Sequence, residues 1–288
     1  MVTSSAPDGP IYIGGLARSG KTYVRLMLAA HPDVFFSKRT NLWTRHHGRY
    51  GDLSRPANLN RCLAALMKSK HIRALEPDAL RLRRELSAGA MTYERLFALL
   101  HSHRAEQLGQ SRWGDQTEGI EAHAPRLLAA DSRAAILHLI RDPRDRYEAL
   151  LDRGRRSAGL ARATADWIRS AKLARQNQHD FPDRYRVIRY EALAARPVET
   201  LAEMADFLGL VATHDMLALG HGSRFADRPG DCPLVTDYIG RFRQHLAPWA
   251  TAYIQQRAAD LLPAFGYAPE PLRLSWPERL RRAAVVLA

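Results

Sequence analysis

Residues 15–22 have the types and the spacing of an anion-binding loop. They follow a short apolar run at 11–13 and precede an amphipathic stretch, which is the order of a strand, a loop and a helix. The backbone N–H groups of such a loop and the N-terminus of its helix converge on one point and favour a bound anion. The sequence therefore predicts that this loop binds a phosphate group. Its polar and cationic members are Arg18, Ser19, Lys21 and Thr22.

Residues 15–22 also fit the Walker A spacing G-x-x-x-x-G-K-[ST], which is typical of nucleotide triphosphatases and kinases. Phosphoryl transfer by such enzymes uses Mg²⁺ held by acidic side chains. The strand expected at 134–140 is followed first by Arg141 and only then by Asp142. Asp142 is already explained as the N-cap of a helix with Pro143 in its first turn. An ATP-dependent kinase acting on a small molecule therefore remains an alternative, and no metal site is predicted.

Apolar runs separated by helical patterns indicate an α/β protein with a parallel β-sheet flanked by helices. The runs lie at 11–13, 34–36, 134–140 and 185–189. The run at 134–140 is nearly all apolar, as expected for a central strand buried on both faces. Ligands bind at the carboxyl ends of parallel strands. The polar segment that follows the run at 34–36 is therefore expected to contact a substrate.

The chain is predicted to form one domain over 1–270, with a helical insertion at about 58–110. Loops and helices between 37 and 118 are expected to form the side of the site that binds the second substrate, the acceptor. The tail at 271–288 is predicted to form a short amphipathic helix. That helix could contact a membrane surface or a second copy of the chain.

Composition narrows the class of protein. The chain has 288 residues, 46% of them hydrophobic, which is enough for a large core. A net charge of +13 suits a polyanionic ligand, yet no nucleic-acid-binding module is recognisable, so no nucleic-acid partner is expected. The N-terminus lacks the pattern of a secretion signal, no window is apolar enough to span a membrane, and the two cysteines are far apart. We expect a cytoplasmic protein.

Four separated stretches resemble the sulfotransferases that depend on 3′-phosphoadenosine 5′-phosphosulfate (PAPS), and they occur in the same order as in that family. The stretches are the loop at 15–22, RDPRDRY at 141–147, the segment at 189–210 and IGRFRQHLAPW at 239–249. The loop resembles the family motif G-x-x-R-S-G-T-T-L, except that Lys21 replaces the first Thr. The resemblance spans most of the chain and implies a P-loop NTPase-like sulfotransferase fold, related to that of the nucleotide kinases.

The resemblance also implies an activity and a set of donor-binding residues. Such enzymes transfer a sulfuryl group from PAPS, without a metal, to a hydroxyl or amine of a small molecule, lipid or glycan. The residues implied for the 5′ end of the donor are Arg18, Ser19, Gly20, Lys21 and Thr22, of which Arg18 and Lys21 would also act in catalysis. The residues implied for the 3′-phosphate are Arg141 and, as the nearest match to a late basic motif, Arg241. Tyr190 would lie near the adenine. Arginine suits such positions because its forked donors are always charged.

Three positions depart from the family pattern. Ala149 replaces a Ser that usually follows the 3′-phosphate Arg by eight residues. Gln116 stands where bacterial relatives carry the Lys of W-G-D-K-T-P, a cation whose charge Lys21 could replace. No carboxylate stands at 37–40, where tyrosylprotein sulfotransferases place a catalytic Glu.

The proton acceptor for catalysis is therefore open. An acceptor hydroxyl loses its proton as its bond to sulfur forms, and a His or a carboxylate can take that proton. The leading candidates, in segments expected to be loops, are His46 and Asp115, followed by His47 and Glu118. A catalytically inactive nucleotide- or anion-binding protein remains a further alternative.

Overall fold

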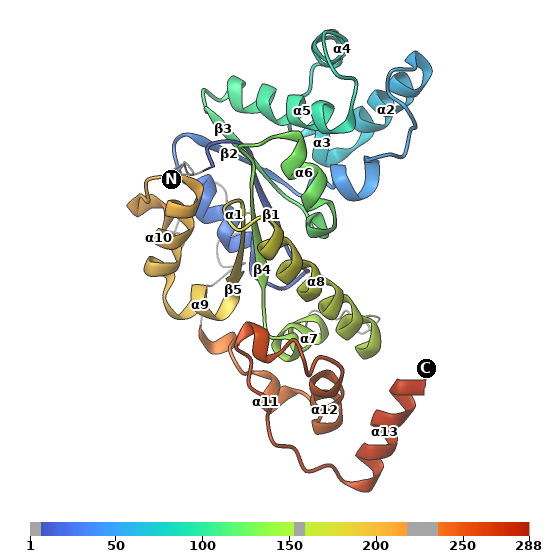
Figure 1. Cartoon of the computed structure of the whole chain (residues 1–288), viewed down its shortest axis with the longest axis vertical. Coiled ribbons are helices and arrows are strands. Elements are labelled where there is room, and N and C mark those ends of the chain that lie inside the picture. The colour runs from blue at the N-terminus through green and yellow to red at the C-terminus, as the bar shows by residue number, and fades with distance from the viewer. Residues whose placement is uncertain (1–6, 153–158, 218–235, 288) are drawn as a thin grey trace.

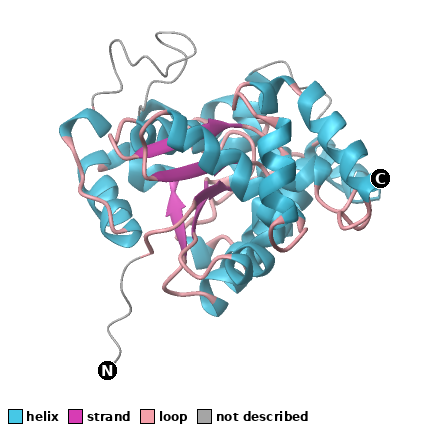
Figure 2. Cartoon of the chain, turned by 90° about the horizontal axis from the view of Figure 1, so that it is seen from above, coloured by secondary structure: helices cyan, strands magenta, loops and turns pink. Residues whose placement is uncertain are grey.

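The structure is a computed structural model that describes residues 7–152, 159–217 and 236–287 (Figure 1). Five parallel strands form one sheet in the order β2-β3-β1-β4-β5. Helices cover both faces of this sheet (Figure 2). The predicted parallel α/β architecture is therefore confirmed. The strands are β1 (Ile11–Gly14), β2 (Val34–Lys38), β3 (Arg112–Gln116), β4 (Ala135–Ile140) and β5 (Tyr185–Arg189).

The helices form groups around the sheet. In Figure 1, α2 to α5 lie together at one end of the molecule and α11 to α13 at the other, with the sheet between them. The described helices are α1 (Lys21–Ala29), α2 (Pro56–Lys68), α3 (Lys70–Arg73), α4 (Ala79–Ser87), α5 (Tyr93–Gln107), α6 (Ala124–Ala130), α7 (Pro143–Asp152), α8 (Leu160–Asp180), α9 (Tyr190–Ala195), α10 (Pro197–Leu208), α11 (Phe242–His245), α12 (Pro248–Arg257) and α13 (Trp276–Leu287).

Alternate side chains of the central strands enter different cores, because successive residues of a strand point to opposite faces. Ile11, Ile13 and Leu137 pack with residues of α1, α9 and α10. Tyr12 and Ile136 pack on the other face with residues of α5 and α6. All six residues of β4 are buried, as predicted for a central strand. This packing on both faces fixes the carboxyl ends of β1 and β4, from which the candidate site is built.

Two segments differ from the sequence prediction. Asp115 was expected in a loop, and this is wrong, because it lies in β3, which runs between β2 and β1. The sequence of β3, RWGDQ, has no apolar run to reveal a strand, and its Gly114 allows close packing: an added Cβ would lie 2.2 Å from the ring of Phe36. The polar segment after β2 is not wholly irregular either. It contains a π-helical turn at Leu42–His46, in which the first two residues are buried.

The stretch predicted as a helical insertion holds α2 to α5, and α5 packs against β2 and β3. The tail forms α13, which packs against α12 and α8. Trp276 is 72% exposed and Leu280 is 51% exposed on this helix. The division at residue 270 and a membrane or dimer contact through the tail remain predictions. Among the described helices, none combines the length and apolar character needed to cross a bilayer.

Candidate active site

A cleft of about 560 Å³ lies along the carboxyl edge of the sheet. Each of the five strands contributes a lining residue at or soon after its carboxyl end. This is the place where open parallel sheets bind their ligands. The lining residues that the sequence singled out for the donor are Arg18, Gly20, Lys21, Thr22, Arg141, Tyr190 and Arg241. The structure therefore brings these seven residues to one cleft.

The loop after β1 is closed on itself by Lys21, the first residue of α1. The Lys21 Nζ donates hydrogen bonds to the carbonyl oxygens of Gly15 at 2.6 Å and Leu16 at 2.5 Å. Burial lowers the pKa of Lys21 to about 8, although Glu118 and Glu121 act in the opposite direction. A dianion arriving at the loop would favour the charged ammonium again. Lys21 thus stabilises the conformation of the loop and can supply a cation to a ligand.

Two residues of the loop have backbone conformations that shape the cleft. Arg18 has φ 71° and Gly20 has φ 96°. A Cβ at Gly20 would lie 2.7 Å from Cδ2 of Tyr190, so glycine lets the loop approach that ring. Ser19 does not line the cleft: it is buried, and its Oγ donates to the Leu16 carbonyl at 2.8 Å. Ser19 supports the loop from behind.

Acidic residues beyond β3 also fix the loop. Glu121 Oε2 accepts a hydrogen bond from the Gly15 N–H at 3.2 Å, and its Oε1 accepts one from Ser170 at 2.7 Å. Glu118 Oε1 accepts a hydrogen bond from the Ala17 N–H at 3.0 Å. The sequence analysis missed the role of Glu121, because a single acidic residue 106 positions from its partner carries no local signal.

Arg141 points its guanidinium at the loop. Its Nη1 donates to the Arg18 carbonyl at 3.3 Å and its Nη2 to the Tyr238 carbonyl at 2.7 Å. The guanidinium carbon lies 4.5 Å from the centroid of the Tyr190 ring. The Arg141 Nε is buried and has no hydrogen-bond partner among the described residues. A buried, unsatisfied N–H on a cation that lines a cleft is suited to an anionic ligand.

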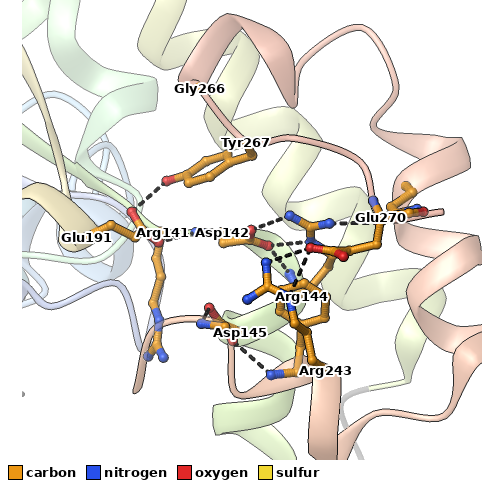
Figure 3. A network of polar contacts seen from close by, with 12 residues as sticks. Arg141, Asp142, Arg144, Asp145, Glu191, Arg243, Gly266, Tyr267 and Glu270 are labelled. Atoms are coloured by element: carbon orange, nitrogen blue, oxygen red, sulfur yellow. Dashed lines mark hydrogen bonds and ion pairs between the residues drawn. The ribbon is translucent and has the colours of Figure 1, made fainter. Parts of the chain in front are cut away.

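The turn that carries Arg141 is held by a polar network (Figure 3). The Asp142 N–H donates to Glu191 Oε1 at 2.9 Å, and the Tyr267 hydroxyl donates to Glu191 Oε2 at 3.0 Å. Asp142 Oδ1 accepts the Arg144 N–H at 2.9 Å, so the predicted N-cap at the start of α7 is confirmed. Burial raises the pKa of Glu191. These contacts join the ends of β4 and β5 to the chain near residue 267.

Arg241 is brought to the cleft by Asp145 of α7. The Asp145 carboxylate accepts hydrogen bonds from the N–H groups of Gly240 at 2.7 Å and Phe242 at 3.0 Å. The side chain of Arg241 then pairs with Glu148 Oε1 at 3.2 Å. The late basic segment is thus tied to α7, and two cationic residues from distant parts of the sequence line the same cleft.

Comparisons with known proteins identify the family and the fold. Residues 10–215 match the model of the sulfotransferase family. The chain belongs to the sulfotransferase family. A comparison with curated protein sequences found no significant match.

Solved sulfotransferase structures share the fold. The sulfotransferase domain of the Synechococcus PCC 7002 olefin synthase has a TM-score of 0.65 at 21% identity, over 93% of this chain and 98% of that one. The sulfotransferase domain from the curacin biosynthetic pathway has a TM-score of 0.52 at 18% identity, over 99% of both chains. A mouse sulfotransferase complexed with PAP has a TM-score of 0.52 at 12% identity, over 99% of this chain and 91% of that one.

The two leading base candidates do not line the cleft of this sulfotransferase. Asp115 is fully buried in β3, so its placement in a loop is wrong. Its carboxylate accepts hydrogen bonds at 2.8 Å from Ser37, Thr40 and Thr117. Such a carboxylate is committed to holding three hydroxyl groups and is not available to an acceptor.

His46 also contacts a residue that does not line the cleft. Its Nδ1 lies 2.9 Å from the Tyr50 hydroxyl, and burial lowers its pKa. His47 stacks on Trp43. Of the four base candidates, Glu118 is the one that lines the cleft. Among the described residues, no group of three or more His, Cys, Asp or Glu side chains is placed to hold a metal ion.

Several residues that line the cleft were not singled out by the sequence analysis. Residues between 37 and 118 were expected on the acceptor side only as a region, because no motif distinguishes one polar side chain there from another. Besides Gln116 and Glu118, which the sequence analysis had named, the structure selects four of them: Arg39, Asn41, Arg45 and His71.

Proposed function

We propose that this sulfotransferase uses PAPS as its donor and transfers SO₃⁻ to a hydroxyl or amine of a small-molecule, lipid or glycan acceptor. The observation that supports the proposal is the position of Arg141. Its guanidinium and the loop at 15–22 stand at the ends of neighbouring strands, β4 and β1, and line one cleft. Two cationic positions about one strand spacing apart suit one nucleotide that is charged at both ends.

The residues divide between the two ends of the donor. The N–H groups of the loop, Lys21 and Thr22 would hold the 5′ phosphosulfate. Arg141, with its unsatisfied Nε, would hold the 3′-phosphate, supported by Arg241. The ring of Tyr190 lies between Gly20 and Arg141 and would pack against the nucleoside. When bound, the donor supplies the sulfuryl group, and the cations of the cleft balance the negative charge.

Glu118 would take the proton from the acceptor. It stands just beyond β3, between the end of β2 and the loop after β1, and lines the cleft. One of its oxygens accepts the Ala17 N–H, which orients the carboxylate and leaves the other oxygen for the acceptor. As the acceptor oxygen bonds to sulfur, its proton passes to Glu118, and Lys21 stabilises the charge left on the departing phosphate oxygen.

Calorimetry with adenosine 3′,5′-bisphosphate and with ATP and Mg²⁺ tests the choice of donor. We expect the bisphosphate to bind and ATP to bind far more weakly. Binding of ATP alone would favour the kinase interpretation of the loop. Glu118→Gln tests the base, because Gln retains an acceptor for the Ala17 N–H. We expect a loss of kcat with an unchanged Kd for the bisphosphate; an unchanged kcat would reject Glu118.

A further inference from the structure

The side of the cleft opposite Arg141 is also cationic. Arg39 follows β2 directly, Arg45 lies in the π-helical turn, and His71 lies in α3. All three side chains are exposed and line the cleft. All three belong to elements that take no part in the proposed donor site, and we call the two arginines the β2-side cations.

Within residues 7–152, 159–217 and 236–287, the two arginines of this set have no acidic partner. Neither Arg39 nor Arg45 forms an ion pair with a carboxylate in the part of the chain that the structure describes. Arginines of the neighbouring helices do: Arg81 pairs with Glu85 at 2.7 Å, and Arg104 pairs with Glu76 at 2.5 Å. The positive charge at this side of the cleft is therefore left for a ligand.

The surrounding charges point the same way. Burial lowers the pKa of Lys38, and the cations Arg25, Arg39 and Lys70 lower it further. Arg39 also acts on Lys21, whose pKa is lowered mainly by burial. Arg39 is thus close enough to influence the loop electrostatically, and a further cation in this region is disfavoured while an anion is favoured.

The turn that presents these residues is anchored in the sheet. Arg39 has φ 48° and Asn41 has φ 54°, and both line the cleft. Thr40 between them is buried, and its hydroxyl donates a hydrogen bond to Asp115 Oδ2 at 2.8 Å. The carboxylate of Asp115, near the end of β3, therefore holds this turn, and the side chains of Arg39 and Asn41 line the cleft.

The order of the strands separates this set from the donor site. The proposed donor site spans the ends of β1 and β4, whereas β2 lies two strands from β1 on the other side. Two strand spacings amount to roughly 10 Å. The β2-side cations are therefore placed beyond the transfer point, where an acceptor would enter.

We propose that the acceptor carries an anionic group of its own, a carboxylate, phosphate or sulfate, and that Arg39 and Arg45 bind this group while the acceptor's hydroxyl or amine faces the loop. The inference rests on the proposed function, since it takes the donor site to be the loop and Arg141. It narrows the acceptor from any nucleophile to an anionic one.

The test uses inorganic phosphate as the probe and the full chain saturated with PAPS. The intact donor fills the loop, Arg141 and the position of the sulfuryl group, so any further phosphate must bind elsewhere. We expect saturable phosphate binding by calorimetry. Arg39→Gln and Arg45→Gln should each weaken it about tenfold, as expected for one charged hydrogen bond. Arg49→Gln is the matched control, because Arg49 is exposed in the same segment and does not line the cleft; it should leave the phosphate Kd unchanged.

The possible failures are distinct. Absence of saturable phosphate binding to the donor-loaded protein would overturn the inference, as would binding that neither glutamine variant weakens. Titration of PAPS alone comes first. If PAPS does not bind, the proposed function is wrong and the inference falls with it; if PAPS binds and phosphate does not, only the inference fails.

Discussion

Replacing Arg141 with Gln is the sharpest test of the proposed donor site. The guanidinium has five N–H donors. Two are used by the carbonyls of Arg18 and Tyr238, and the Nε–H is buried without a partner, so three remain for a ligand. A hydrogen bond to a charged group contributes about 1.5–3 kcal/mol. Loss of two such bonds to a phosphate would cost at least about 3 kcal/mol, or a rise of roughly 100-fold in Kd.

The measurement compares two ligands by calorimetry. Adenosine 3′,5′-bisphosphate has the 3′-phosphate that Arg141 would bind, and adenosine 5′-monophosphate lacks it. We expect the unmodified protein to bind the bisphosphate far more tightly than the monophosphate, and this preference should nearly vanish in Arg141→Gln. Equal weakening of both ligands would refute the assignment, because it would show that Arg141 acts on the loop and not on the 3′-phosphate.

Arg184→Gln provides the matched control. Arg184 also donates to backbone carbonyls, at 2.8 Å to Leu128 and 3.2 Å to Ser132, and it lies over the ring of Phe181. It lies just before the amino end of β5, whereas the cleft lies at the carboxyl ends of the strands. Both variants lose carbonyl contacts and a cation–π contact, so both should lower Tm by a few degrees, at about 2–4 °C per kcal/mol. Arg141→Gln alone should change ligand binding.

Three further changes have defined outcomes. The Kd for the bisphosphate should rise by up to about tenfold per pH unit above roughly pH 8, where Lys21, with its pKa of about 8, loses its proton. Lys21→Arg should abolish this rise, and a Kd that stays flat above pH 8 in the unmodified protein would contradict it. Gly20→Ala should weaken bisphosphate binding at least about tenfold, because the added Cβ would clash with the ring of Tyr190 and alanine is strained at a φ of 96°. Calorimetry measures this Kd. Unchanged binding would show that Tyr190 does not belong to the donor site. Asp115→Ala should lower the free energy of unfolding, measured in urea, by about 3 kcal/mol or more, since three buried hydroxyls lose their acceptor. Unchanged stability with lost turnover would instead favour Asp115 as the catalytic base.

The sequence predicted the features whose causes are local. The loop at 15–22 has its own spacing, and β4 is a nearly all apolar run that is followed directly by Arg141. Tyr190 follows β5 in the same way. The resemblance to the sulfotransferases singled out Arg141 and Tyr190, and both lie at the carboxyl ends of parallel strands, where ligands bind. Their placement in one cleft follows from the parallel sheet.

The features that the sequence could not predict depend on distant partners. Asp115 was taken for a loop residue because a short strand of polar and aromatic residues has no apolar pattern, and its three hydroxyl partners come partly from 75 and 78 positions away. Glu121 acts on the loop through a contact that no spacing reveals. Arg39 and Arg45 look like solvated surface residues until the sheet brings the end of β2 beside the cleft.

Glu191 links Asp142 to Tyr267, and this link determines how far the chain can be shortened at its C-terminal end. The part that matches the family ends at residue 215, yet the carbonyl of Tyr238, the side chain of Arg241 and the hydroxyl of Tyr267 all complete the surroundings of Arg141. A fragment cut at that boundary would retain the loop at 15–22 and lose the side of the cleft that Tyr238 and Arg241 line. Minimal versions for crystallisation or for grafting into other enzymes should therefore extend at least through residue 267.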